Sequence, residues 1–141
     1  MFSNASSTAR SGTPESPTPR VLVERMVTEL VSSQRWSWVT FETKEMKHFV
    51  EVALEGDNEL VINVAYEFSE DYRSLFTRES ITIPDGWRVS KFKPKGWIGA
   101  GTFLLTTGVC DIVRIAEFVD RLFPALYGES PDYQLSGVFQ S

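Results

Sequence analysis

Two side chains in this sequence are of the types that most often move protons or act as nucleophiles. They are His48, the only histidine, and Cys110, the only cysteine. Because no second histidine and no cysteine lies near His48, the ligand spacing of a zinc site is missing. We interpret His48 as a hydrogen-bonded structural residue beside Tyr66 at the rim of the core. Cys110 falls in the first turn of the last expected helix, where thiols can become reactive, but an isolated cysteine is usually a small buried hydrophobe.

Two further patterns carry little chemistry. Gly99 and Gly101 form a lone G-x-G without the other residues of a phosphate-binding loop, and they indicate a bulge or close packing. Glu51, Glu55 and Glu59 are expected to form a solvated acidic edge, because paired carboxylates catalyse only when a cleft holds them. The sequence therefore predicts a protein that is not an enzyme, with no catalytic residue, no metal and no cofactor.

The strongest local charge is a basic segment followed by Trp97. Its four cations are Arg88, Lys91, Lys93 and Lys95. They stand against a formal net charge of −5, which makes the surface dipolar. One interpretation is a docking patch that steers and complements an acidic partner. The other is protection of an exposed strand edge, which lysine and proline keep from pairing with another chain.

Length and composition limit the function further. At 141 residues the chain predicts one domain. Its pI near 4.9 disfavours binding to nucleic acid, which needs a basic footprint. A single cysteine excludes an internal disulfide and fits a reducing compartment. No apolar run resembles a secretory signal or a membrane span, so we expect a cytoplasmic protein that does not bind membranes.

The segment from His48 to Tyr66 organises the expected fold. Its alternation predicts two strands joined by a turn at Gly56-Asp57-Asn58. A three-residue turn places the apolar residues on one face, which must then be the core face. The cross-strand pairs are Leu54 with Leu60, Val52 with Ile62, Val50 with Val64 and His48 with Tyr66. The opposite face is mixed, so it is either half-covered or open to a partner.

The chain before this hairpin predicts three segments. Residues 1–18 have little apolar content and are expected to be a disordered leader. A helix over about 19–33 follows from apolar residues at helical spacing. Residues 36–42 are expected to form a strand whose Trp36 and Trp38 lie on the core face of the hairpin.

After the hairpin, a short helix is expected to open at Ser69-Glu70-Asp71, because serine is a favourable N-cap. Its apolar face consists of Tyr72, Leu75 and Phe76. Strands over residues 87–92 and 99–106 follow the turn at Pro84-Asp85-Gly86.

The last predicted helix covers about 107–127. Pro124 should kink or interrupt it, and Gly128 is a natural stop. Residues 129–141 form a C-terminal tail that is either loose or packed back as an extended segment.

These elements predict an α+β fold with an antiparallel sheet of about five strands, in the order α-β-β-β-α-β-β-α. The expected organisation is a leader at 1–18, a single domain at 19–128 and a tail at 129–141.

Several short motifs between Phe49 and Gly128 resemble one known family. They are the Phe49–Val52 strand, Glu67 after the second strand, Ile83-Pro84-Asp85-Gly86-Trp87, Gly96-Trp97, and the closing Leu126-Tyr127-Gly128. In these motifs and in its element order the chain resembles the TY-Chap domains, relatives of bacterial type III secretion chaperones. The resemblance implies a secretion-chaperone-like fold and a cytoplasmic bacterial protein-binding domain, often homodimeric. It carries over no catalytic residue.

The first functional hypothesis is therefore a non-enzymatic module that holds a segment of another protein, by strand addition or in apolar pockets. The residues expected to bind the partner are Arg88, Lys91, Lys93, Lys95, Trp97, Tyr72, Leu75 and Phe76. The alternative is an immunity-type protein that neutralises a toxin, with Glu51, Glu55 and Asp57 facing a basic active site.

Overall fold

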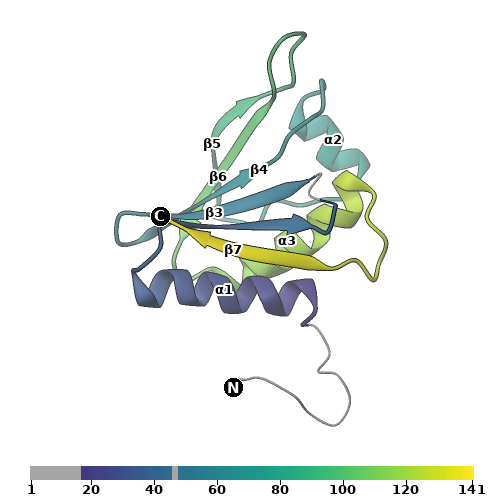
Figure 1. Cartoon of the computed structure of the whole chain (residues 1–141). Helices are drawn as coiled ribbons and strands as arrows, with labels where there is room; N and C mark the ends of the chain where they lie inside the picture. The colour runs from purple at the N-terminus through teal and green to yellow at the C-terminus, as the bar shows by residue number, and fades with distance from the viewer. Residues whose placement is uncertain (1–16, 46–47) are drawn as a thin grey trace.

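A computed structural model describes residues 17–45 and 48–141 of the chain. The expected leader, 1–18, lies almost wholly outside the described residues. Helices and strands follow one another as shown in Figure 1. They are α1 (Pro19–Ser33), β2 (Trp38–Thr43), β3 (Phe49–Glu55), β4 (Glu59–Val64), α2 (Tyr72–Arg78), β5 (Arg88–Lys93), β6 (Thr102–Gly108), α3 (Ile112–Tyr127) and β7 (Leu135–Gln140).

The strands form one antiparallel sheet in the order β5-β6-β4-β3-β2-β7, so β5 and β7 are its edges. The organising hairpin is confirmed. Val50 pairs with Val64, Val52 with Ile62 and Leu54 with Leu60. Gly56 has a φ of +65°, which suits the tight turn. The α+β class with an antiparallel sheet is therefore confirmed, but the strands number six in the described chain, not about five.

The additional strand comes from the expected tail. Of the two alternatives for residues 129–141, packing back as an extended segment is the observed one, because β7 pairs with β2 along its whole length. Gly137 permits this approach, since a Cβ there would collide with the Met26 sulfur and crowd the Phe41 ring. Residues 135–140 thus belong to the same sheet as the rest of the domain.

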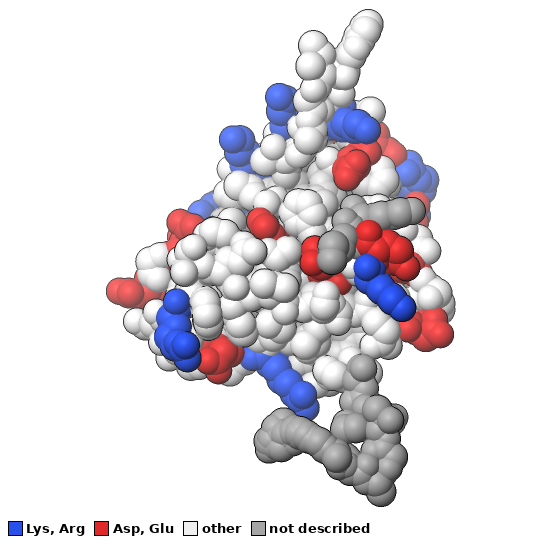
Figure 2. Space-filling model, viewed as in Figure 1, with Lys and Arg blue, Asp and Glu red and all other residues white. Residues whose placement is uncertain are grey.

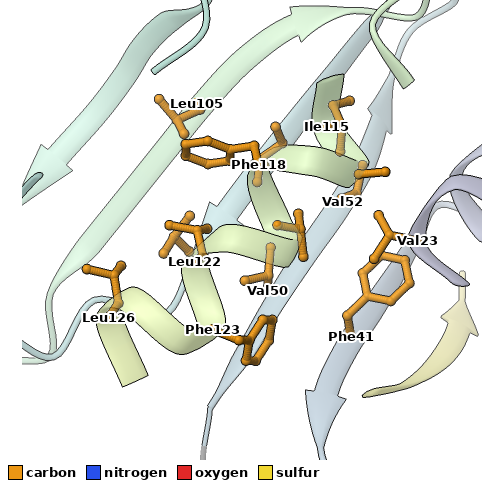
Figure 3. Packing of buried hydrophobic residues seen from close by; sticks show 14 of the residues in the cluster. Val23, Phe41, Val50, Val52, Leu105, Ile115, Phe118, Leu122, Phe123 and Leu126 are labelled. Atoms are coloured by element: carbon orange, nitrogen blue, oxygen red, sulfur yellow. The ribbon is translucent and has the colours of Figure 1, made fainter. Parts of the chain in front are cut away.

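All three helices pack on one face of this sheet. Apolar side chains of α3 point toward the strands in Figure 3, beside Val23 of α1. The residues labelled there are Val23, Phe41, Val50, Val52, Leu105, Ile115, Phe118, Leu122, Phe123 and Leu126. Helix α2 joins the same layer, because the Phe76 ring lies 5.4 Å from that of Phe103 and 6.4 Å from that of Phe118. The core therefore fills one side of the sheet.

The expected placement on the core face is wrong for Trp38 but holds for Trp36, which packs against the core. Trp38 pairs with Ala53, on the face away from the helices. The buried positions of β2 belong to Val39 and Phe41, which are fully buried. Strand β2 begins only at Trp38, so Trp36 precedes it and does not follow its alternation. The Trp36 ring stacks at 5.6 Å on Phe139 of β7, which pairs with the buried Val39 on the helix side of the sheet.

Two helix starts also differ from expectation. Asp71, not Ser69, caps α2, and its carboxylate accepts a hydrogen bond from the Arg73 N–H at 2.8 Å. Helix α3 starts at Ile112 rather than near residue 107, because β6 continues through Gly108. Gly128 ends α3 with a φ of 70°, as the sequence predicts.

Candidate binding surfaces

The sheet face opposite the helices is the largest candidate surface. We call it the open face. Cross-strand pairing aligns Trp38, Ala53, Val61 and Thr106 in one row across four strands. The next row places Leu104 beside Asn63. The apolar side chains in these rows are only half-buried, and together with Glu51 and Asn63 they line a shallow hollow of about 310 Å³.

A polar row crosses the centre of the open face. The Thr40 hydroxyl donates to one oxygen of the Glu51 carboxylate at 3.2 Å, and the Asn63 amide donates to the other, also at 3.2 Å. The three side chains come from neighbouring strands and are partly buried. Both oxygens of the one acid at the centre are thus held in place, which gives the surface a fixed charge beside its apolar hollow.

Three cations of the basic segment lie on edge strand β5, and Lys95 follows its end. An irregularity between Val89 and Lys91 shifts the register, so that Arg88, Lys91 and Lys93 all align with the open-face positions of β6. Arg88 lies at the far end of the strand, where its guanidinium is 4.0 Å from the Glu59 carboxylate. Figure 2 shows Lys and Arg atoms beside the β5–β6 hairpin and an uncharged tip projecting past them.

The tip of this hairpin carries two fully exposed apolar residues. Trp97 is 100% exposed and Ile98 is 95% exposed. The Gly96 N–H donates to the Gly99 carbonyl at 3.0 Å, so these two residues occupy the centre of a turn. Trp97 was among the expected binding residues, but Ile98 was not. The sequence does indicate that Ile98 is exposed, because glycines on both sides of the Trp-Ile pair are typical of a turn.

Helix α2 does not expose the apolar face that was expected to bind the partner. Leu75 and Phe76 are 2% and 4% exposed, and the partly buried Tyr72 ring lies 4.9 Å from each of the Phe92 and Phe103 rings. Their apolar spacing reflects packing in the core. The expected partner-binding set therefore divides into two buried residues and the partly buried Tyr72 on α2, and five exposed residues on or beyond β5.

His48 lies against Tyr127, not in a chain of hydrogen bonds. The two rings stack with centroids 4.3 Å apart and an angle of 1°. Among the described residues, the buried His48 Nδ1 has no hydrogen-bond partner, and the Glu129 carboxylate is 4.0 Å away. The Tyr127 hydroxyl donates to the Ala65 carbonyl, and burial raises the pKa of this tyrosine. The expectation of a hydrogen-bonded histidine is thus wrong for Nδ1.

The other residues considered for chemistry have structural surroundings. Cys110 is exposed in the turn before α3, so it is neither buried nor inside the helix. Gly101 confirms close packing, because a Cβ there would collide with the Tyr66 carbonyl. Within residues 17–45 and 48–141, no three His, Cys, Asp or Glu side chains gather in a way that could hold a metal ion.

One polar cluster was missed in the sequence. The Asp111 carboxylate accepts hydrogen bonds from the Thr107 hydroxyl at 2.6 Å and the Trp87 indole at 3.0 Å, and the Arg114 guanidinium lies 3.3 Å away. These donors, Thr107 foremost, hold the pKa of Asp111 below its ordinary value. The cluster fixes the start of α3 against the Trp87 turn.

No family model, no curated protein and no solved structure matches this chain. The likeness to TY-Chap domains therefore stays a prediction. In the described residues, no helix has both the length and the apolar character needed to cross a membrane.

Proposed function

We propose that the chain is a non-enzymatic protein-binding module and that its open face receives the partner. One observation carries this proposal: α1, α2 and α3 cover the same side of the sheet, and the opposite side has an apolar centre without a covering layer in the described residues. Exposed apolar patches rimmed by polar groups are typical of protein interaction sites.

The layout of the open face favours a protein over a small molecule. Its hollow is shallow, and its apolar side chains spread over four neighbouring strands. A flat, mixed surface of this kind suits the core and polar rim of a protein interface. Its charges also differ by position, with the Glu51 carboxylate at the centre and the cations of β5 along one edge.

Edge strand β7 provides a second place where the same partner can bind, by adding a strand to the sheet. Its sequence, LSGVFQ, has no lysine, arginine or proline, whereas β5 has three cations. Lysines on an edge discourage another strand from pairing there. An extended partner segment would therefore add beside β7 rather than β5, and its remaining chain would cross Val138 onto the open face.

The test is affinity capture with mass spectrometry, using wild type and two single variants. Ala53→Arg places a long charged side chain between Trp38 and Val61. Ser74→Arg adds the same charge at an exposed position of α2. We expect a partner that wild type and Ser74→Arg capture and Ala53→Arg does not. Equal capture by all three proteins would show that the open face is not the binding surface.

A further inference from the structure

The β5–β6 hairpin is a separate feature that binding at the open face does not require. It projects beyond the body of the molecule in Figure 1, and its tip is uncharged in Figure 2. Trp97 and Ile98 at the tip have almost no contact with the rest of the protein. Two adjacent large apolar side chains that are fully exposed indicate a surface that contacts another molecule.

The base of the hairpin is fixed. The Phe92 ring lies 5.1 Å from the Tyr66 ring and 5.7 Å from the Phe103 ring. The Lys95 N–H donates to the Phe68 carbonyl at 2.8 Å, and Gly101 lies too close to the Tyr66 carbonyl for a side chain. The tip is therefore held out from the body by a packed aromatic base.

All charged residues of the β5–β6 hairpin itself are cations. Residues 86–110 contain Arg88, Lys91, Lys93 and Lys95 but no aspartate or glutamate. Lys93 and Lys95 stand next to the tip, and the Lys93 ammonium lies beside Gly99. The chain as a whole has a net charge of −5, whereas this element has four cations and no acid of its own. Over about 10 Å, the screening distance at 0.1 M salt, an approaching surface meets these local cations first.

We propose that the β5–β6 hairpin is a peripheral membrane contact, in which Trp97 and Ile98 enter the interface of a bilayer containing anionic lipids. Tryptophan is favoured at the level of the lipid headgroups, and lysines just behind an inserted tip meet anionic headgroups. A protruding tip with no adjoining wall suits a fluid interface better than a rigid protein surface, which must provide a matching pocket. The expectation that the protein avoids membranes came from the lack of a spanning segment, and peripheral contact needs none.

The test is sedimentation of the full chain with lipid vesicles at about 0.1 M salt. One set contains phosphatidylcholine alone and the other adds phosphatidylglycerol. We expect wild type to bind the anionic vesicles and not the neutral ones. The double variant Trp97→Ala, Ile98→Ser should bind at least about ten-fold more weakly, because the inserted apolar area is gone. Lys93→Glu with Lys95→Glu should also lose about ten-fold or more.

Two controls separate the tip from general effects. Arg20→Glu with Arg25→Glu changes the net charge equally, on exposed positions of α1 at the other end of the molecule. Val138→Ser removes a partly exposed apolar side chain from β7. Both should bind vesicles like wild type, and the melting temperature of each variant checks its folding.

Three results would overturn the proposal. They are no binding of wild type to anionic vesicles, undiminished binding by the tip variant, and equal loss in the α1 charge variant. A captured protein that depends on Trp97, without any vesicle binding, would assign the tip to a protein pocket instead. None of these results depends on the Ala53→Arg experiment, so the two proposals can fail separately.

Discussion

The Tyr133 hydroxyl lies 3.1 Å from the backbone carbonyl of Asp120 and 3.1 Å from the carboxylate of the same residue, so both oxygens accept from this one donor. This carbonyl has no helical donor, because the residue four positions later is Pro124, which lacks an N–H. The Tyr133 ring also stacks on Phe123 at 5.5 Å. The tyrosine thus replaces the missing hydrogen bond, α3 continues without interruption to Tyr127, and the segment leading to β7 is attached to the helix.

Tyr133→Phe should lower the free energy of unfolding by about 1–2 kcal/mol, because it removes the donor from the partly buried carbonyl and carboxylate of Asp120. Urea denaturation measures the change. In a Pro124→Ala background the restored N–H can serve the Asp120 carbonyl, so the same substitution should cost less there. An equal loss in both backgrounds would show that the hydroxyl does not compensate the proline.

Stability should fall in alkaline solution. Burial, with the charges of Glu70 and Asp71 adding to it, raises the pKa of Tyr66 to about 12, and burial also raises those of Tyr127 and Tyr133. In the unfolded chain a tyrosine loses its proton near pH 10. Above that pH the folded state holds more protons than the unfolded state, so stability falls as pH rises from about 10 to about 12.

Urea midpoints measured at about pH 9 and about pH 11 check this expectation. Tyr66→Phe removes one of the three groups, so the midpoint of this variant should fall less between the two pH values. A drop of the same size in wild type and variant would mean that Tyr66 does not contribute to the effect.

The sequence predicts the central hairpin well because two local signals agree there. Alternating apolar residues on both strands are joined by Gly56-Asp57-Asn58, and only one register places all of them on one face. Strand β7 was harder to predict, because Gly137 interrupts the apolar positions Leu135 and Phe139, and its partner strand lies far away in the sequence.

The binding surfaces were predicted only in part, because exposure depends on contacts between segments that lie far apart in the sequence. Spacing shows that Tyr72, Leu75 and Phe76 share one helix face, but it cannot distinguish a face that meets the core from one that meets a partner. Trp38 was assigned to the core for its apolar character, although Val39 and Phe41 offered the other parity. Exposure of Trp97 depends on how far the hairpin projects, which is a property of the whole sheet.

Two glycines of the β5–β6 hairpin should differ sharply in how much stability is lost when alanine replaces them. Gly101→Ala would drive a Cβ into the Tyr66 carbonyl, and overpacking against backbone typically costs about 1–3 kcal/mol. Gly96→Ala meets no atom within 4 Å and should be nearly neutral. Thermal unfolding of both variants compares them, and similar melting temperatures would contradict the close packing at the hairpin base.

We also propose that the chain forms a homodimer, because the half-buried apolar side chains at the centre of the open face suit a two-fold interface between copies. Light scattering at micromolar concentration should give about twice the 16.0 kDa of one chain. If copies meet through the open face, Ala53→Arg should return the mass to that of a monomer while Ser74→Arg does not. A monomeric wild type would contradict the expectation.

The central claim is that the open face of the sheet contacts another protein, and site-specific photo-crosslinking in cells tests it most directly. A photoreactive phenylalanine analogue at position 38 replaces Trp38 on the open face, and the same analogue at the exposed position of Ser74 is the control. From position 38 we predict a discrete adduct heavier than the 16.0 kDa chain that mass spectrometry shows to contain a second, different protein, and none from position 74. No adduct from position 38, or the same adducts from both positions, would contradict the assignment of this face.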